Sequence, residues 1–185
     1  LSEFLVKSIM KQLCQAAEFM HRHNICHRDL KPDNVMVTKY RPQHGTPNDS
    51  TAVGGLFDPI AITVIDLNVA FEVTPENPRI RYGTGLKEWS APETRGQQFT
   101  DFNIDTWTIG CVMYFICTGQ PPFRENAPID VSQIDFVQAL LAYSNSETFP
   151  EMTNFLMGLI VADPMDRMTA AEALAHPWLN AQPYE

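Results

Sequence analysis

The sequence predicts a mainly helical α+β domain with one short two-stranded β ribbon. Residues 3–22 repeat apolar side chains at helical spacing, residues 35–38 and 60–65 are β-branched runs, and residues 105–117 are apolar nearly all round. The chain has 185 residues, of which 44% are hydrophobic and 19% are charged. This length and composition suit one globular domain with its own core.

The N-terminal part is predicted to contain one long helix and the ribbon. Within residues 3–22 the apolar positions at helical spacing are Leu5, Ile9, Leu13, Ala16 and Met20. The runs at 35–38 and 60–65 are expected to pair as strands. Residues 40–58 between them are dense in Pro, Gly, Asn, Asp and Ser, which predicts a long inserted surface loop.

The C-terminal part is predicted to be irregular at first and then helical. Proline and glycine break any periodicity between residues 69 and 93. A capping box formed by Thr169 and Glu172 predicts the start of the last helix, and residues 176–179 should pack back on the body. The predicted helices of this part are 105–117, 132–143, 151–161 and about 170–174.

Charge and cysteine usage exclude several classes of protein. The formal net charge of −9 argues against general nucleic-acid binding, which needs basic surface. The apolar run 109–117 is too short to span a bilayer, so no membrane partner is expected. The cysteines show no paired spacing, which predicts reduced thiols in a cytoplasmic protein, with the nucleus as the alternative; they are Cys14, Cys26, Cys111 and Cys117.

Several potential metal ligands are crowded near the end of the first predicted helix. They are His21, His23, Cys26 and His27. They lack zinc-finger spacing, and no second ligand cluster follows them, so a zinc site is not predicted.

The octapeptide at residues 27–34, His-Arg-Asp-Leu-Lys-Pro-Asp-Asn, carries the chemistry of the chain. Asp29 can accept a proton from a hydroxyl group. Lys31 can neutralise charge on a phosphoryl group in transfer, and Asn34 can hold a magnesium ion. An acid, a cation and an amide at these spacings therefore predict phosphoryl transfer.

This octapeptide resembles the catalytic loop of eukaryotic protein kinases. The order of elements over about residues 1–180 is similar to the large C-terminal lobe of that family, and the ending resembles the calmodulin-dependent kinase group. The resemblance implies a kinase C-lobe at 1–180 and a tail at 181–185. No Gly-rich phosphate loop and no strand lysine precede the match, so the N-lobe is expected to be absent from this chain.

The resemblance also implies an ATP and Mg²⁺ site. Asp66 stands where kinases place the Asp of Asp-Phe-Gly, which holds magnesium, although the triplet here is Asp-Leu-Asn. Asn34 would be the second metal ligand, and Lys31 would contact the phosphates. Met36 and its two neighbouring valines match the apolar floor beneath the adenine.

Five further residues are implied to organise the site. Glu93, of Ala-Pro-Glu, is expected to pair with Arg167 on a later loop. Asp105 resembles the Asp that holds the catalytic-loop backbone, although a simple helix N-cap is the other interpretation and both can hold. His27 and Arg28, close to the predicted base Asp29, complete the set. In the family, the arginine binds a phosphate on the activation segment.

Candidate phosphate acceptors on that segment are Thr74 and Thr84. The family's threonine that contacts the base and the lysine is replaced here by Leu86, which puts substrate positioning in question.

These features predict a serine/threonine protein kinase that transfers the γ-phosphate of ATP to a protein hydroxyl. Lys31 favours the serine/threonine class over the tyrosine class. The alternative is a catalytically inactive kinase-like module that serves as a protein-binding scaffold. In either case an N-lobe or a partner protein is expected to cover the floor of the ATP site.

Overall fold

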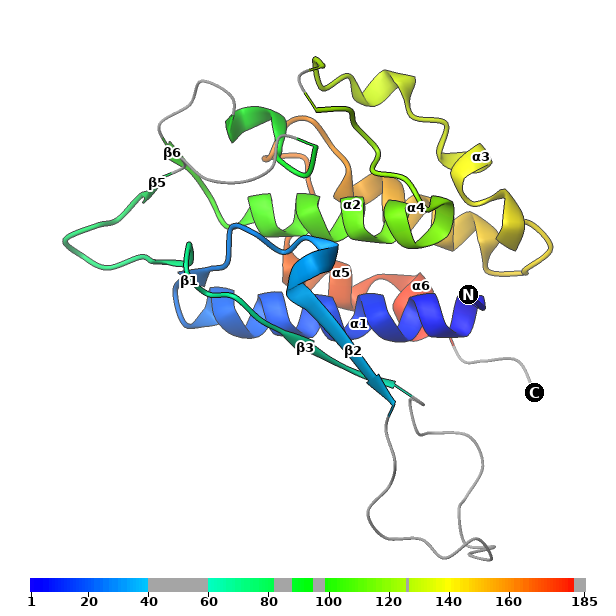
Figure 1. Cartoon of the computed structure of the whole chain (residues 1–185), viewed down its shortest axis with the longest axis horizontal. Helices are drawn as coiled ribbons and strands as arrows, with labels where there is room; N and C mark the ends of the chain where they lie inside the picture. The colour runs from blue at the N-terminus through cyan, green and yellow to red at the C-terminus, as the bar shows by residue number, and fades with distance from the viewer. Residues whose placement is uncertain (40–59, 82–87, 95–98, 126, 182–185) are drawn as a thin grey trace, which may run out of the picture.

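Helices dominate the structure, a computed structural model that describes residues 1–39, 60–81, 88–94, 99–125 and 127–181. The helices are α1 (Glu3–Arg22), α2 (Asn103–Thr118), α3 (Phe136–Ala139), α4 (Phe149–Leu159), α5 (Ala170–Ala175) and α6 (Pro177–Asn180). The strands are β1 (Ile25–Cys26), β2 (Val35–Lys39), β3 (Ile60–Val64), β4 (Phe71–Glu72), β5 (Ile80–Arg81) and β6 (Phe99–Thr100). Figure 1 shows α1 and α2 as neighbouring rods and the β2–β3 ribbon crossing α1.

Helix α1 has the bounds that its apolar spacing predicts. Ser2 caps its N-terminus by accepting the N–H of Leu5, and Glu3 lies in the first turn, where a negative charge opposes the positive end of the helix dipole. One face of the helix is buried in the core: Val6, Ile9, Met10, Leu13, Cys14 and Ala17. The burial of this face fixes α1 under the ribbon and beside α2.

Helix α2 is the central helix, and its residues 104–113 are all buried. It contacts α1 and α4. A side chain at Gly110 would come within 2.8 Å of Ile160 Cγ1 and 2.9 Å of Leu159 Cβ, so the absence of a Cβ allows the close approach of α4. Gly119 ends the helix with φ 75°, a conformation that glycine adopts without steric cost.

The predicted ribbon forms by antiparallel pairing of β2 and β3, with Val35 opposite Val64 and Lys39 opposite Ile60. Within the part of the chain that the structure describes there are two further two-stranded sheets, β1–β4 and β5–β6, which the prediction of a single ribbon missed. Each of these strands has only two residues, which is too short for a sequence alternation to show. Tertiary contacts, and not local propensity, define them.

The predicted single helix at 132–143 is wrong. The structure has a 3₁₀ turn at Val131–Gln133, the short α3 and a second turn at Leu141–Tyr143. Asp135 explains the interruption, because its side chain accepts the N–H of Gln138 and starts a new turn within this range. Asp130, just before the range, caps the first turn by accepting the N–H of Ser132. Side-chain caps of this kind compete with the helical backbone bonds and start new turns.

The remaining helices agree with the prediction to within two or three residues. The capping box is confirmed, since Thr169 accepts the N–H of Glu172 while the Glu172 carboxylate accepts the N–H of Thr169. His176 caps α6 by accepting the N–H of Trp178, whose indole is fully buried. The segment at 176–179 therefore packs on the body as expected.

The predicted loop at 40–58 and all but Ala181 of the predicted tail lie outside the described residues. Among the helices that the structure describes, none is both long and apolar enough to cross a membrane.

The approach of α4 to α2 gives a stability prediction. In Gly110→Ala the new methyl group meets the backbone-proximal Cβ of Leu159, which cannot swing away. Overpacking costs about 1–3 kcal/mol and alanine gains about 1 kcal/mol of helix propensity, so we expect a net loss in urea unfolding that is centred on about 1 kcal/mol and does not exceed about 2 kcal/mol. Gly119→Asn is the control, since asparagine tolerates positive φ; an equal loss in both variants would contradict the packing argument.

Candidate active site

The backbone at the start of the loop at residues 27–34 donates hydrogen bonds to a buried carboxylate at the start of α2. Asp105 Oδ2 accepts the backbone N–H of His27 at 2.8 Å, and Oδ1 accepts that of Arg28 at 2.8 Å. The His21 Nε2 at 2.9 Å and the Cys26 thiol at 3.4 Å also contact Oδ2. Asp105 has no exposed surface, so these donors replace its hydration.

His27 links this loop to the end of β3. Its Nδ1 accepts the backbone N–H of Asp29 at 3.3 Å, so the ring proton lies on Nε2, which contacts the carbonyl of Ile65 at 3.2 Å. The ring is fully buried. His27 therefore sets the spacing between the loop and the residue that precedes Asp66.

Asp29, Lys31 and Asn34 come together in one cluster. Lys31 Nζ lies 3.0 Å from Asp29 Oδ2, and Asn34 Nδ2 donates to the same oxygen at 2.9 Å and to the Asp29 carbonyl at 2.8 Å. The 3₁₀ turn at Pro32–Asn34 folds the amide back on the acid. Both donors use Oδ2, so Oδ1 is the oxygen that remains for a substrate proton.

Asn34 and Asp66 lie at the same end of the β2–β3 ribbon. The N–H of Ile65 donates to the carbonyl of Asn34 at 3.0 Å, which places the residue after Ile65 beside the start of β2. Asp66 adopts φ 66° and is exposed, and its Oδ1 accepts the N–H of Asn68 at 3.2 Å. The Asn34 amide donates through Nδ2 to Asp29, which turns its oxygen away from the acid.

This donor set fits a hard divalent cation. Magnesium prefers carboxylate and amide oxygens and keeps several waters or phosphate oxygens in its shell. The carboxylate of Asp66 and the side-chain oxygen of Asn34 are of that chemistry. The carboxylate of Asp66 is exposed and the side chain of Asn34 is buried, so Asp66 is the more accessible of the two to a phosphate-bound cation.

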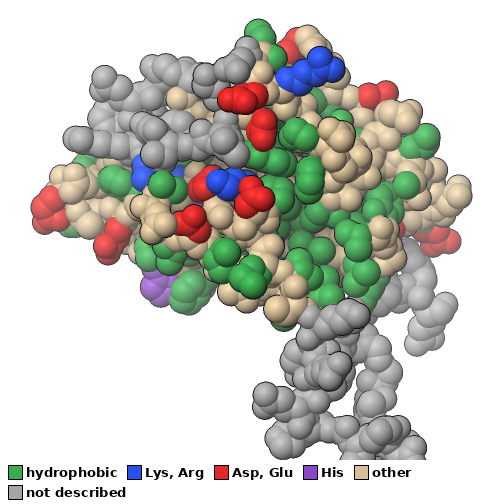
Figure 2. Space-filling view, in the orientation of Figure 1, with side chains coloured by type: hydrophobic (Ala, Val, Ile, Leu, Met, Phe, Trp, Pro, Cys, Tyr) green, Lys and Arg blue, Asp and Glu red, His purple; other side chains and the backbone are tan. Residues whose placement is uncertain are grey.

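The ribbon also exposes apolar side chains. Met36 is 51% exposed and Val37 is 53% exposed, and Leu67 of the Asp-Leu-Asn triplet is 61% exposed. Figure 2 shows hydrophobic side chains spread over this face of the molecule, beside a small group of Lys, Arg, Asp and Glu side chains. An apolar surface therefore adjoins a charged one.

Arg28 is turned toward the segment that follows Asp66. It adopts φ 68°, donates through Nε to the carbonyl of Val69, and its guanidinium lies 5.6 Å from the centre of the Phe71 ring. Thr74, a predicted phosphate acceptor, starts a turn in which its hydroxyl oxygen accepts the N–H of Asn77 at 3.1 Å. Thr84 and Leu86, the other predictions on this segment, lie outside the described residues.

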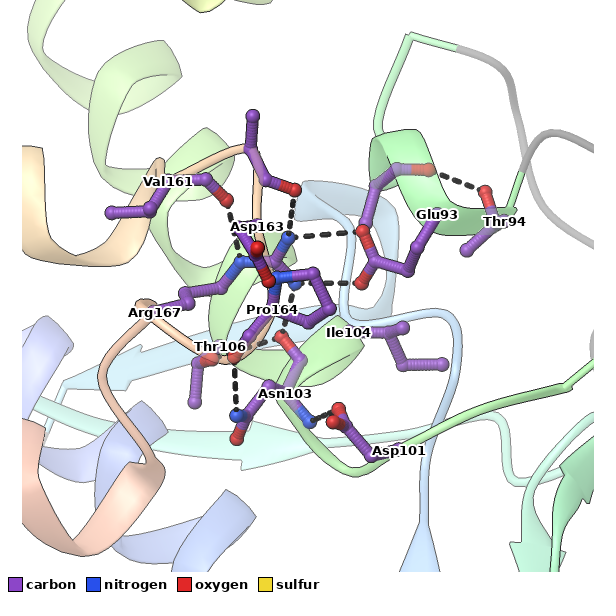
Figure 3. Close-up of polar contacts among 12 residues, drawn as sticks. Glu93, Thr94, Asp101, Asn103, Ile104, Thr106, Val161, Asp163, Pro164 and Arg167 are labelled. Atoms are coloured by element: carbon purple, nitrogen blue, oxygen red, sulfur yellow. Dashed lines mark hydrogen bonds and ion pairs between the residues drawn. The ribbon is translucent and has the colours of Figure 1, made fainter. Parts of the chain in front are cut away.

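Glu93 and Arg167 form a bidentate ion pair, at 2.7 Å and 2.9 Å between guanidinium and carboxylate (Figure 3). The same guanidinium also donates to three backbone carbonyls, those of Val161, Asn103 and Ala162. It lies 4.9 Å from the centre of the Trp107 ring. Arg167 thereby joins the 3₁₀ turn at Pro92–Thr94 to the start of α2.

The contacts of His21 and Cys26 with Asp105 have no signal in the sequence. The sequence suggests only a possible metal-ligand role for His21, yet its side chain contacts Asp105, which lies 84 residues away in the sequence. The described residues do include a potential ligand group of His21, Cys26 and Asp105. Asp105 already accepts four donors, so its carboxylate is the centre of a hydrogen-bond network. Burial raises the pKa of the Cys26 thiol far above its usual range, which keeps it a hydrogen-bond donor in this network.

Comparisons with known proteins show the family of the chain. The family profile described as "Protein kinase domain" matches residues 1–179. The chain is 30% identical over 182 residues to serine/threonine-protein kinase 17A of Oryctolagus cuniculus, covering 95% of this chain and 40% of that protein. It is 29% identical over 184 residues to myosin light chain kinase 2, skeletal/cardiac muscle, of Bos taurus, covering 97% and 26%.

A third relative is sperm motility kinase 3A of Mus musculus, 33% identical over 185 residues, covering 97% of this chain and 32% of that protein. The chain thus spans 26–40% of the length of these three curated relatives.

The buried ion pair gives a second stability prediction. Arg167→Met leaves the Glu93 carboxylate without its partner and removes three donors to carbonyls, so we expect a loss of about 3–5 kcal/mol in urea unfolding. The matched control is Arg22→Met, which breaks the exposed pair of Arg22 and Glu18 at 3.6 Å. That pair should be worth less than about 1 kcal/mol. Similar losses in the two variants would contradict the structural role of Arg167.

Proposed function

We propose a function from the premise that this chain belongs to the protein kinase domain family. In this proposal it is part of a serine/threonine kinase that transfers the γ-phosphate of ATP to a protein hydroxyl. The observation that carries the proposal is the cluster in which Lys31 and Asn34 both bind one oxygen of Asp29. Such a cluster leaves the acid oriented, with one oxygen free for a substrate. The matched relatives include proteins named serine/threonine and myosin light chain kinases.

In this proposal Asp29 orients the attacking hydroxyl and accepts its proton through Oδ1. Its other oxygen, held by Lys31 and Asn34, cannot turn toward a competing donor. The ammonium group of Lys31 lies 3.0 Å from the Asp29 carboxylate. It can turn toward the transferred phosphoryl group and stabilise the negative charge that develops there. The chemistry therefore depends on positioning and on electrostatic stabilisation.

Asn34 and Asp66 would hold Mg²⁺ at the open end of the ribbon, and Met36 would lie beneath the adenine of ATP. Bound magnesium–ATP supplies the phosphoryl group and neutralises part of its charge. The exposed side chain of Met36 suits a flat aromatic ring, because stacking on it removes apolar surface from water. Arg28 would couple this site to the segment at 69–72, which it already contacts.

The competing function is a catalytically inactive kinase-like scaffold. The Asp-Leu-Asn triplet favours it, because asparagine replaces a glycine of the family pattern. Against this, Asn68 is not among the described residues with positive φ, so the turn observed here does not require the conformational freedom of a glycine at this position. The retained cluster of acid, lysine and amide favours the enzyme.

The wider context is also a proposal. We assign residues 1–180 to the C-lobe of a kinase domain, with an N-lobe or partner protein covering the exposed Met36 and Val37. The matches to myosin light chain kinases favour the calmodulin-dependent group. Four free cysteines, three of them buried, suit the reducing interior of a cell.

The function is tested by Asp29→Asn in the full-length protein. Asparagine keeps the shape but cannot accept the proton, so we expect transfer to a protein substrate to fall by at least about 100-fold at saturating magnesium–ATP. Radiolabelled phosphate incorporation measures the rate. The matched control is Asp166→Asn, an exposed aspartate on another loop, which should keep the wild-type rate. Wild-type turnover in Asp29→Asn would rule out the proposed role, and no transfer by the wild type would favour the scaffold.

A further inference from the structure

Among the described residues, the outer edge of β3 is bound by the side chain of Gln12 and not by another strand. In the ribbon, Ala61, Thr63 and Ile65 face β2, as shown by the bond from Ile65 to Asn34 and the pairing register. The backbone groups of Ile60 and Ile62 therefore point to the opposite edge, toward α1. An unpaired strand edge carries free N–H and C=O groups that need partners.

Gln12 of α1 supplies both partners. Its Nε2 donates to the carbonyl of Ile60 at 3.2 Å, and its Oε1 accepts the N–H of Ile62 at 3.1 Å. A residue of a parallel strand makes the same two contacts, with the C=O of one residue and the N–H of the residue two positions later. The side-chain amide thus replaces one residue of a neighbouring strand.

The amide is itself fixed in this orientation. Its Nε2 also contacts the carbonyl of Ser8 at 3.3 Å and the hydroxyl of Ser8 at 3.1 Å. Ser8 is 4% exposed, so this anchor lies inside the molecule. Because an amide has two N–H donors and one carbonyl oxygen, bonds on both sides determine which way it points.

We propose that Gln12 is a positioning residue for the metal site: its amide sets the register of β3 against α1 and so places Asp66. This inference rests on the proposed function, in which Asp66 holds magnesium. Asp66 lies four residues after Ile62 and is itself exposed, so little packing holds it directly. The rigid strand before it must supply the position, as residues behind a metal ligand commonly do.

The variant that tests this is Gln12→Met in the full-length protein. Methionine has a similar length, no branch and similar helix propensity, but it makes neither amide bond. The matched control is Gln15→Met, the same change at an exposed position of the same helix. If Gln12→Met does not fold, Gln12→Ala removes the same two bonds and takes its place.

Amide hydrogen exchange is the first readout, and it needs no activity. In Gln12→Met the N–H of Ile62 should exchange about 5-fold faster, as expected for the loss of one hydrogen bond, and the N–H of Ile65 should follow. Residues 104–113 of α2 should keep their protection. Faster exchange at Ile62 with unchanged exchange at 65–68 would overturn the proposal, because Gln12 would then stabilise the strand without placing Asp66.

The second readout is the magnesium dependence of phosphoryl transfer. Gln12→Met should raise the magnesium concentration for half-maximal rate about 10-fold and largely keep the rate at saturating magnesium, while Gln15→Met should match the wild type. An unchanged magnesium requirement in Gln12→Met would overturn the proposal. If the wild-type protein transfers no phosphate, the proposed function fails, and hydrogen exchange at Ile62 and Ile65 alone decides the role of Gln12.

Discussion

The buried carboxylate of Asp105 is the interaction on which the candidate active site depends. Removing a carboxylate from water costs several kcal/mol unless donors replace the lost hydration. Asp105 receives two backbone N–H groups, an imidazole nitrogen and a thiol, and it lies in the first turn of α2, where the helix dipole favours a negative charge. These donors all come from α1 and the segment after it, so the charge can be buried only when the loop at 27–34 has its native backbone.

The first turn of α2 contacts both the loop at 27–34 and the Glu93–Arg167 ion pair. Asp105 holds the loop from one turn of the helix, while the carbonyl of Asn103, in the same turn, accepts the guanidinium of Arg167 and so connects to Glu93. The side chain of Trp107 lies beneath that guanidinium, one turn further on. A single buried helix end therefore fixes both the loop at 27–34 and the Ala-Pro-Glu turn, and a shift of α2 would move both.

The sequence predicted those parts of the fold that follow from local periodicity or from local capping. Helix α1 and the Thr169 capping box are examples, because their signals lie within a few neighbouring residues. The prediction of one helix at 132–143 was wrong because Asp135 caps a new turn inside this apolar pattern, after Asp130 has capped a separate turn at its start. The contact of His21 with Asp105 could not be predicted at all, since only the packed fold brings these residues together.

The same distinction applies to the site. The octapeptide predicts which side chains act, but the spacing alone does not show that Lys31 and Asn34 share one oxygen of Asp29. That detail depends on the 3₁₀ turn at Pro32–Asn34, which bends the amide back toward the acid. Likewise the position of Asp66 depends on an amide from α1, and a glutamine in a helical repeat gives no indication of a strand-like contact.

Two charged residues at this site, Arg28 and Asp66, have positive φ, and the contacts that offset the strain differ between them. For a residue other than glycine, the left-handed conformation costs about 1–2 kcal/mol. Arg28 offsets this cost through the carbonyl of Val69 and the ring of Phe71. Asp66 is exposed, and among the described residues the one hydrogen bond recorded for its carboxylate is the local one from Asn68. This local bond offsets part of the strain, as short polar side chains commonly do in the left-handed conformation. The magnesium that we propose for this carboxylate would be a second reason for an aspartate at a position that little packing holds.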